Sequence, residues 1–312
     1  MRYAVISDIH GNLPALKAVL EDAAQQGAEH YLIAGDYCLS GAWPDECLSV
    51  IRAMPDAHII RGNEEAYVEN LVGKDQSLWT DGQMQISYWV YRNLSDNNRE
   101  YMLALPHTAD IMQGSVPIHM AHSSAAFIGP YELDVCGTNI AKRYKGRKLD
   151  ADILYGDMYS ELDSDRAFQD AVSALDEGVY VFGHTHVQWH YKLKNKEVYL
   201  INPGSCGLPV DGLSGIPYTL LDISDDGQVN IEERRLPFDK QAYIGRLKHT
   251  TQYTEANVWT RIIIKELETA REHMMFFIPF ANQYADSIGD AVRPFSVETW
   301  KRAYEEWSGE RI

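Results

Sequence analysis

The segment Tyr3-Ala4-Val5-Ile6-Ser7-Asp8-Ile9-His10 decides the fold, because a short apolar run ends at side chains that can hold a metal ion or a phosphate. Short apolar runs bounded by polar residues and glycine are typical of buried strands. After this segment, Asn12 can cap a helix with Pro14 in its first turn, and apolar residues follow at helical spacing. The order of strand, loop and helix predicts a layered α/β protein.

The same arrangement recurs along the chain. Five further apolar runs end at Gly35-Asp36, Arg61-Gly62-Asn63, His122, Gly183-His184-Thr185-His186 and Asn202-Pro203-Gly204-Ser205. In open α/β sheets, ligands collect at the carboxyl ends of the strands, so residues that are far apart in the sequence can converge there. We therefore expect one site built from these strand ends.

Each motif is weak by itself, because D-x-H pairs are common by chance and a lone histidine is usually structural. Together the motifs supply seven N and O donors, which are enough for two metal ions with room for water and phosphate oxygens. The candidate ligands are Asp8, His10, Asp36, Asn63, His122, His184 and His186. A structural zinc site usually includes cysteine. Oxygen and imidazole donors without thiolate favour manganese, with iron, zinc, cobalt or nickel as alternatives.

The ordered motifs D-x-H, G-D, G-N, H and G-H-T-H resemble the calcineurin-like metallophosphoesterase family from residue 1 to about residue 237. The runs Asn202-Pro203-Gly204-Ser205 and Leu103-Ala104-Leu105-Pro106 are similar to the small bacterial branch, which includes nucleotide and diadenosine polyphosphate hydrolases. The resemblance implies a four-layer α-β-β-α sandwich of two mixed sheets, with the metal site at the carboxyl ends of the strands.

The resemblance also implies a role for each ligand. Asp8, His10 and His186 would hold one ion, Asn63, His122 and His184 the other, and Asp36 would bridge them. Asp36, Asn63, His122 and Glu64 are the expected catalytic residues. In the implied mechanism, a hydroxide that bridges the two ions attacks phosphorus in line. His119 lies within the preceding strand, and we assign it to packing.

One motif departs from the family pattern. The family usually has G-N-H followed by an acid, and its histidine stabilises the phosphoryl group or protonates the leaving oxygen. Here the run is Gly62-Asn63-Glu64-Glu65. A carboxylate cannot donate a proton as an imidazolium does unless it is strongly desolvated. This predicts a preference for leaving groups that need little protonation. Alternatively, Glu64 only caps the following helix.

The chain is predicted to have a metallophosphoesterase domain over residues 1–237 and a C-terminal helical extension over residues 238–312. The excursion over about residues 125–177 is too long for a simple connection, and we expect it to cover part of the site as a cap-like insertion. Within it, Arg143, Lys145 and Arg147 could bind the outer phosphates of an extended substrate. The alternative, which we favour, is a solvated loop or helix face. The apolar face of the extension either packs on its own core or forms a homo-oligomer interface.

The composition restricts the partners. There are 28 Lys and Arg against 45 Asp and Glu, and the formal charge of −17 argues against a nucleic-acid polymer or an anionic membrane. The four cysteines form no C-x-x-C pair. With neither a signal peptide nor a long apolar segment, we predict a cytoplasmic protein. The favoured function is a phosphodiesterase or a diadenosine polyphosphate hydrolase acting on a small phosphorylated substrate. A broad phosphomonoesterase and a non-catalytic metal-bound scaffold are the alternatives.

Overall fold

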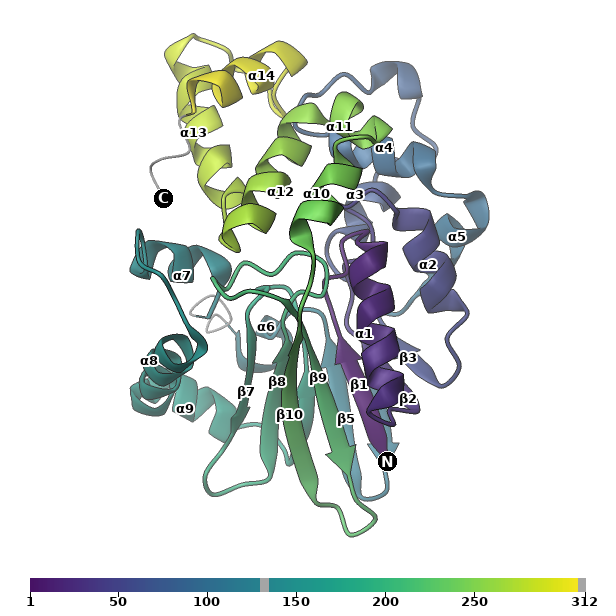
Figure 1. The fold of residues 1–312 in the computed structure, drawn as a ribbon, viewed down its shortest axis with the longest axis vertical. Coiled ribbons are helices and arrows are strands. Elements are labelled where there is room, and N and C mark those ends of the chain that lie inside the picture. Colours follow the sequence, from purple (N-terminus) through teal and green to yellow (C-terminus); the bar gives the residue numbers. More distant parts are fainter. Residues whose placement is uncertain (130–134, 308–312) are drawn as a thin grey trace.

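The computed structural model describes residues 1–129 and 135–307, which form two sheets packed face to face (Figure 1). The first sheet has the order β10-β9-β1-β2-β3, and the second has the order β4-β5-β6-β8-β7. The strands are β1 (Arg2–Ile6), β2 (His30–Ile33), β3 (Ala57–Ile59), β4 (Thr108–Gln113), β5 (Val116–Ala121), β6 (Gly178–Val181), β7 (Gln188–Lys192), β8 (Val198–Pro203), β9 (Ile216–Ile223) and β10 (Val229–Leu236). Both sheets are mixed, because β1 pairs parallel with β2 but antiparallel with β9, and β8 pairs parallel with β6 but antiparallel with β7.

Alternate side chains along each strand point to opposite layers. Val5 and Leu32 face the second sheet, where they meet Met120 and Val181 in a buried cluster. Ala4 and Ile6 face the opposite way and pack against the helices of the first outer layer. Those helices are α1 (Leu13–Gln25), α2 (Pro44–Arg52), α4 (Gln85–Asn93) and α5 (Asp96–Ala104), while α6 (Ala125–Ile128), α8 (Ala151–Ser164) and α9 (Arg166–Ser173) cover the second sheet. The predicted four-layer α-β-β-α sandwich is therefore confirmed.

Local signals in the sequence explain several of these elements. The Asn12 side chain accepts a hydrogen bond from the backbone N–H of Ala15 at 3.2 Å and caps α1 as predicted. The turn sequence Asp225-Asp226-Gly227 predicts a hairpin. In the structure this hairpin joins β9 to β10, and Gly227 supplies the positive φ of the turn. Two strands were not foreseen, namely β4 and β7. Both lie at the edges of the second sheet, where an alternating or polar sequence gives a weak strand signal.

The remaining helices surround the strand ends. Three of them are short: α3 (Glu65–Glu69), the 3-10 turn η1 (Gln76–Leu78) and α7 (Gly137–Arg143). The others form the C-terminal part of the chain and are α10 (Lys240–Leu247), α11 (Thr251–Glu255), α12 (Asn257–Thr269), α13 (Met274–Ser287) and α14 (Val297–Glu306). Residues 130–134 of the predicted insertion and 308–312 of the predicted extension lie outside the described residues. None of the described helices combines the length and the apolar character that a membrane crossing needs.

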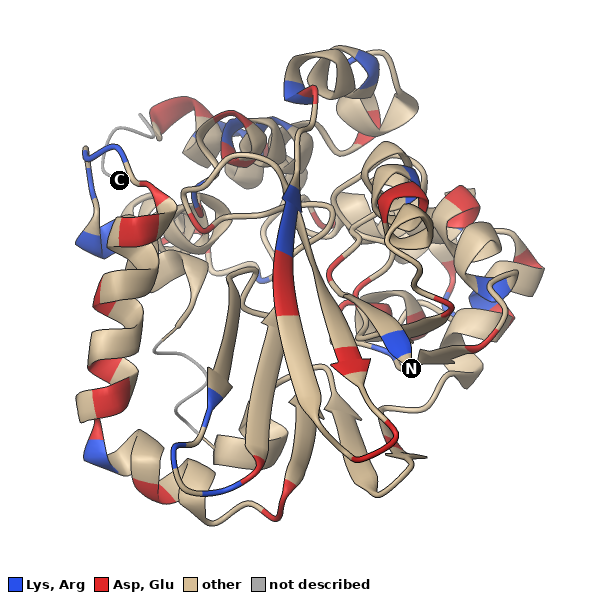
Figure 2. Ribbon diagram, turned by 60° about the horizontal axis from the view of Figure 1, so that its bottom comes forward, with Lys and Arg blue, Asp and Glu red and all other residues tan. Residues whose placement is uncertain are grey.

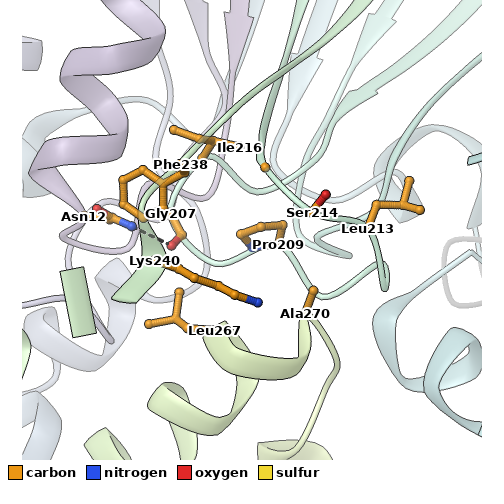
Figure 3. Close-up of a pocket in the computed structure, with 11 residues that line it drawn as sticks. Asn12, Gly207, Pro209, Leu213, Ser214, Ile216, Phe238, Lys240, Leu267 and Ala270 are labelled. Carbon is orange, nitrogen blue, oxygen red and sulfur yellow. Dashed lines mark hydrogen bonds between the residues drawn. The ribbon is translucent and has the colours of Figure 1, made fainter. Parts of the chain in front are cut away.

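The C-terminal helices are joined to the loop after β2 and to helix α4 by hydrogen bonds, and to the loop before β9 by apolar contacts. Gln252 Nε2 donates to the carbonyl of Ser40 at 2.7 Å, and Trp89 Nε1 donates to Thr251 Oγ1 at 3.0 Å. A cavity of about 90 Å³ lies where the loop before β9, including Leu213, meets Phe238, Leu267 and Ala270. Figure 3 shows these lining residues. These contacts place α12 directly beside the loops that follow the strands.

Candidate metal centre

The first part of the site is formed by the loops that follow β1 and β2. These strands are parallel neighbours, so Asp8 and Asp36 emerge at the same edge of the sheet. The loops run side by side beyond the strands, because the N–H of Asp8 donates to the carbonyl of Gly35 and the N–H of His10 donates to the carbonyl of Asp36, both at 3.0 Å. The D-x-H and G-D motifs are therefore held in register by the backbone.

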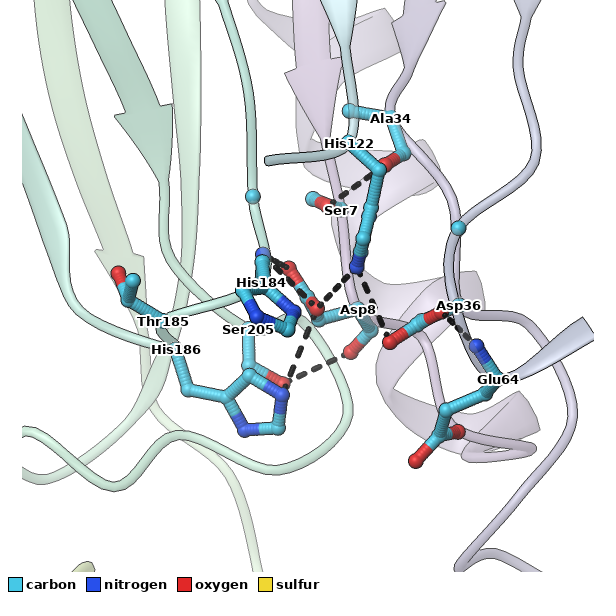
Figure 4. A network of polar contacts seen from close by, with 12 residues as sticks. Ser7, Asp8, Ala34, Asp36, Glu64, His122, His184, Thr185, His186 and Ser205 are labelled. Carbon is cyan, nitrogen blue, oxygen red and sulfur yellow. Dashed lines mark hydrogen bonds and ion pairs between the residues drawn. The ribbon is translucent and has the colours of Figure 1, made fainter. Parts of the chain in front are cut away.

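The second part comes from the facing sheet, where His122 follows β5 and the pair His184 and His186 follows β6. The N–H of Gly183 donates to the carbonyl of His122 at 2.9 Å and aligns these two loops. Across the interface, the N–H of His184 donates to Asp8 Oδ2 at 3.0 Å. Figure 4 shows the imidazoles and carboxylates of both sheets converging on one place.

Two groups of ligand atoms result, and within each group all the atoms lie within 4.8 Å of one another. The first consists of Asp8, His10 and His186, and the second of Asp36, His122 and His184. A third set links Asp36 to His10 and Glu64 within the same distance, so Asp36 reaches both groups. Six of the seven predicted ligands are thus brought together in these groups. The seventh, Asn63, lines the same cavity.

The imidazoles are oriented by backbone carbonyls that the sequence could not identify. His122 Nδ1 lies 2.6 Å from the carbonyl of Ala34, His186 Nδ1 lies 2.9 Å from that of Leu208, and His10 Nδ1 lies 3.2 Å from that of Leu39. A carbonyl oxygen only accepts, so Nδ1 must carry the proton in each ring. In the neutral rings this leaves the Nε2 lone pairs directed at the site, which is the tautomer that metal-bound histidines use.

The electrostatic surroundings of the imidazole Nε2 atoms favour a bound cation. His10 Nε2 and His186 Nε2 are 2.9 Å apart, and two facing lone pairs at that distance repel unless a proton or a metal ion lies between them. His122 Nε2 is buried without a hydrogen-bond partner, although Asp36 Oδ2 lies 3.1 Å away. Burial lowers the pKa of His122, but the Asp36 carboxylate outweighs this and raises the pKa to about 10. In the same way, Glu64 raises the pKa of His10 to about 9 against the effect of burial.

The ligand loops also have unusual backbone conformations. Five of the seven predicted ligands have positive φ angles, namely Asp8 (53°), His10 (49°), Asp36 (56°), His184 (70°) and His186 (57°). Non-glycine residues avoid this region, and such positions cost about 1–3 kcal/mol each unless the surrounding structure fixes them. They cluster at functional sites, and here they coincide with the proposed ligands.

Two glycines allow the loops to approach closely. A Cβ atom at Gly183 would lie 1.9 Å from Ser7 Oγ and 2.4 Å from Asp8 Oδ2. A Cβ atom at Gly62 would lie 2.1 Å from Asp36 Oδ1. Any larger residue would therefore displace a ligand carboxylate, which explains why glycine opens both G-N and G-H-T-H.

The sequence analysis placed the run from Asn202 to Ser205 among the strand ends of the site but gave no individual role to its residues or to Glu65. Glu65 is fully buried and accepts from the N–H groups of Gly62 (2.6 Å) and Tyr37 (2.8 Å), so it ties two ligand loops together. Asn202 Nδ2 donates to the carbonyl of Gly183 at 2.9 Å. Ser205 Oγ donates to the carbonyl of Asp8 at 2.8 Å. These residues brace the ligand loops. Their placement after strands was the only signal in the sequence.

Glu64 lies beside the proposed ligands. Its Oε2 is 2.9 Å from His10 Nδ1, and its N–H donates to Asp36 Oδ1 at 2.9 Å. The side chain makes no capping hydrogen bond to α3. His119, by contrast, is directed away from the ligands: its Nδ1 is 2.6 Å from Asp110 Oδ1, and its ring stacks on Tyr180.

The basic run of the insertion lies elsewhere. Figure 2 shows Lys and Arg gathered around the loop between α7 and α8, with the acidic residues of α8 beside them. Arg143 forms an ion pair with Glu161 on α8, and the guanidinium of Arg147 lies 5.9 Å from the centre of the Tyr144 ring. The structure does not bring Arg143, Lys145 or Arg147 to the lining of the cavity at the ligands.

That cavity has a volume of about 290 Å³ and opens above the ligand loops. Its floor includes His10, Asp36, Asn63, Glu64, His184 and His186. The insertion contributes Cys136, Gly137 and Thr138, and the C-terminal helices contribute Trp259, Ile263, Glu266, Glu272, Met274, Met275 and Ile278. Three separate parts of the chain therefore enclose the space in which a ligand would meet the metal-binding groups.

Comparisons with known proteins agree with this arrangement. The sequence profile described as the calcineurin-like phosphoesterase superfamily domain matches residues 1–226. The uncharacterized protein MJ0912 of Methanocaldococcus jannaschii is 28% identical over 258 residues, which cover 77% of this chain and 89% of that protein. Among solved structures, a metallophosphoesterase from Sphaerobacter thermophilus has a TM-score of 0.55 at 20% identity, covering 86% of this chain and all (100%) of that one. The hypothetical protein PH1004 from Pyrococcus horikoshii has a TM-score of 0.59 at 18% identity, covering 87% and 99%.

Proposed function

Because the chain belongs to the calcineurin-like phosphoesterase superfamily and is a metal-dependent phosphoesterase, we propose that its site holds two metal ions and hydrolyses small phosphate esters. The observation that supports this best is the convergence of two groups of ligand atoms, each within 4.8 Å, with Nε2 lone pairs directed at them. A single ion would leave one of the two groups without a cation. Manganese is the ion that we favour for this oxygen and imidazole donor set.

In this proposal, each ligand has a defined task. Asp8, His10 and His186 hold one ion, and Asn63, His122 and His184 hold the other. Asp36 bridges them, which is supported by its proximity to both groups. Ions in these positions would supply Lewis acidity and lower the pKa of a bound water so that it can attack phosphorus.

The residues of the chain then orient and restrict the reaction. Asn63 lies on the floor of the cavity, where its amide can contact a phosphate oxygen. Glu64 holds His10 through the contact to Nδ1 at 2.9 Å, so its carboxylate is engaged in orienting a ligand. A leaving oxygen would receive no proton from this position. We therefore propose that good leaving groups are preferred.

The candidate substrates differ in the side chains that they require. A dinucleotide polyphosphate needs positive side chains for its outer phosphates, but no Lys or Arg among the described residues lines the cavity. If Arg143, Lys145 and Arg147 do bind those phosphates, their joint replacement by alanine should raise KM for that substrate about tenfold and leave an aryl phosphate unaffected. An equal effect on both substrates would assign the three residues to the surface. A phosphomonoesterase or phosphodiesterase needs no such side chains.

The proposed function is tested by measuring metal content and activity together. Protein purified without added metal is analysed by atomic emission, stripped with a chelator and titrated with Mn²⁺ while hydrolysis of aryl phosphate mono- and diesters is followed. The proposal expects two ions per chain and activity that returns with the second. A metal-loaded protein that hydrolyses no ester would instead favour a non-catalytic scaffold.

A further inference from the structure

The C-terminal helices form one wall of the cavity, and this wall is apolar. Trp259 and Ile263 come from α12, and Met274, Met275 and Ile278 come from α13. Trp259 is anchored to the core through its Nε1, which lies 3.4 Å from Ser40 Oγ. Residues of the matched family domain end at 226, so this wall is contributed by a part of the chain that the domain does not include. The non-phosphate part of a substrate bound at the ligands would contact it.

The charged groups in the cavity are all acidic apart from the imidazoles. Glu64, Glu266 and Glu272 line it, and among the described residues no Lys or Arg does. Metal ions would neutralise Asp36 and its neighbours on the floor, but Glu266 lies on α12 and Glu272 in the loop between α12 and α13. An anionic group attached to the substrate beyond its phosphate would therefore meet carboxyl groups and no cation.

The buried carboxyl of Glu266 strengthens this conclusion. Its Oε1 accepts from the N–H groups of His273 and Met274, both at 2.8 Å, and its side chain is 2% exposed. Burial, together with the nearby Glu272, raises the pKa of Glu266 well above its ordinary value. The wall thus places a buried carboxyl group among apolar side chains, which suits an uncharged substrate group and disfavours a second anion beside it.

The wall is apolar, it carries carboxyl groups, and no Lys or Arg among the described residues lines the cavity. We therefore propose that the C-terminal helices select phosphate esters of apolar alcohols, that is, esters that carry no negative charge except on the phosphate. Aryl and alkyl esters of modest size fit this description. The volume of about 290 Å³ is near the lower limit of about 300 Å³ for small-ligand sites, which also disfavours an extended polyphosphate. This inference rests on the proposed function, because the ligand loops must bind the phosphate.

Binding can be measured independently of turnover with two phosphonates of similar size. Calorimetric titration of the manganese-loaded protein compares 4-methylphenylphosphonate with 4-carboxyphenylphosphonate, which differ in one negative charge. The expected result is at least tenfold tighter binding of the methyl compound, corresponding to about 1.4 kcal/mol. Equal binding, tighter binding of the carboxylate or no binding of either compound would overturn the inference.

A pair of lysine variants tests whether the wall causes the preference. Met275 and Ile288 are similarly exposed, at 56% and 52%, and both lie at α13 or its end, but only Met275 lines the cavity. Met275→Lys should reduce the ratio of the two dissociation constants about tenfold, because it places a cation at the wall. Ile288→Lys should leave the ratio within about twofold of wild type, since it adds the same charge outside the cavity. Equal effects of the two variants would refute a role of the wall.

Hydrolysis of the matching 4-methylphenyl and 4-carboxyphenyl phosphates separates this inference from the proposed function. Turnover of both esters with equal kcat/KM would leave the phosphoesterase intact and refute the selective wall. Selective phosphonate binding without turnover of any ester would support the selective wall and refute the proposed hydrolysis.

Discussion

At the scale of single residues, Asp36 has the most demanding position in the site. Its carboxylate belongs to a group with His122 and His184 and to another with His10 and Glu64. Its Oδ1 also accepts the N–H of Glu64 at 2.9 Å, and its backbone has a φ of 56°. Burial raises the pKa of Asp36, but the adjacent His122 outweighs this and the net shift is downward, so the carboxylate is ionised. A neutral side chain of the same shape would therefore remove the charge that serves both groups.

We expect Asp36→Asn to lower kcat by at least about 100-fold and to reduce the metal content, because an amide bridges two cations poorly. Steady-state kinetics and atomic emission on the same preparation measure both effects. Asp110→Asn is the matched control, since Asp110 is exposed and contacts only His119 among the polar groups described for it. Near-normal kcat with both ions retained in Asp36→Asn would refute the bridging role.

Glu64 leads to a prediction about leaving groups. If no acid at position 64 protonates the leaving oxygen, log kcat/KM should fall steeply as the pKa of the leaving alcohol rises, and Glu64→His should reduce the slope by restoring a donor. A series of substituted aryl phosphates gives the slope, and insensitivity of the rate to solvent viscosity shows that chemistry limits it. A shallow slope in the wild-type protein would mean that another group supplies the proton.

At the scale of elements, the sequence predicted the central strands well and the edges poorly. β1, β6 and β8 are almost entirely buried on both faces and therefore read as apolar runs. β4 and β7 lie at sheet edges and mix polar with apolar residues, so their apolar signal is diluted. The turn and cap residues Asn12 and Gly227 were informative because their chemistry is local.

The same distinction applies to the site. The ligand positions follow strand ends, so sequence order and topology together were sufficient to nominate them. The groups that orient the ligands are mostly backbone carbonyls, such as those of Ala34 and Leu208, and any residue type can supply a carbonyl. The contribution of α12 and α13 to the cavity was not predicted, because no motif marks a wall made of ordinary apolar side chains.

Helix α12 carries a pH-dependent contact. The pKa of Glu266 is raised by burial and by Glu272, so the folded protein retains a proton that the unfolded chain releases above the ordinary pKa of 4.5. This stability is complete below the ordinary pKa and is lost as pH rises towards the raised value. Glutamine keeps a neutral side chain at every pH.

Glu266→Gln should therefore gain stability relative to wild type as pH rises from 5.5 to 8.5, by up to about 1.4 kcal/mol per pH unit. Urea unfolding of both proteins across this range, without added metal, measures the difference. Glu306→Gln, which neutralises an exposed glutamate of α14, should show no such trend. A difference that stays constant with pH would mean that Glu266 is ionised in the folded protein.

At the scale of the whole molecule, the ligands join the two sheets. Asp8 and Asp36 belong to one sheet and His122, His184 and His186 to the other, so ions at this site would cross-link the layers. An ion that binds the folded chain but not the unfolded chain raises the free energy of unfolding by RT ln(1 + [L]/Kd), or about 2.7 kcal/mol when its concentration is 100 times Kd.

Removal of metal should accordingly abolish activity and lower the melting temperature, and Mn²⁺ should restore both. Differential scanning calorimetry of the stripped protein against Mn²⁺ concentration measures the shift. In Asp36→Asn the increase should be much smaller at the same concentration. A melting temperature independent of Mn²⁺, in protein shown by analysis to be metal-free at the start, would contradict the proposed cross-link.

The position of β1 in the first sheet has a consequence for the newly synthesised chain. β1 is made first, but it lies between β2 and β9, and β9 ends at Ile223. The carbonyl of Asp8 is held by Ser205 and by the N–H of Gly207. A nascent polypeptide on the ribosome therefore has an unpaired edge of β1, and an unbraced first ligand loop, until some two hundred residues have been translated.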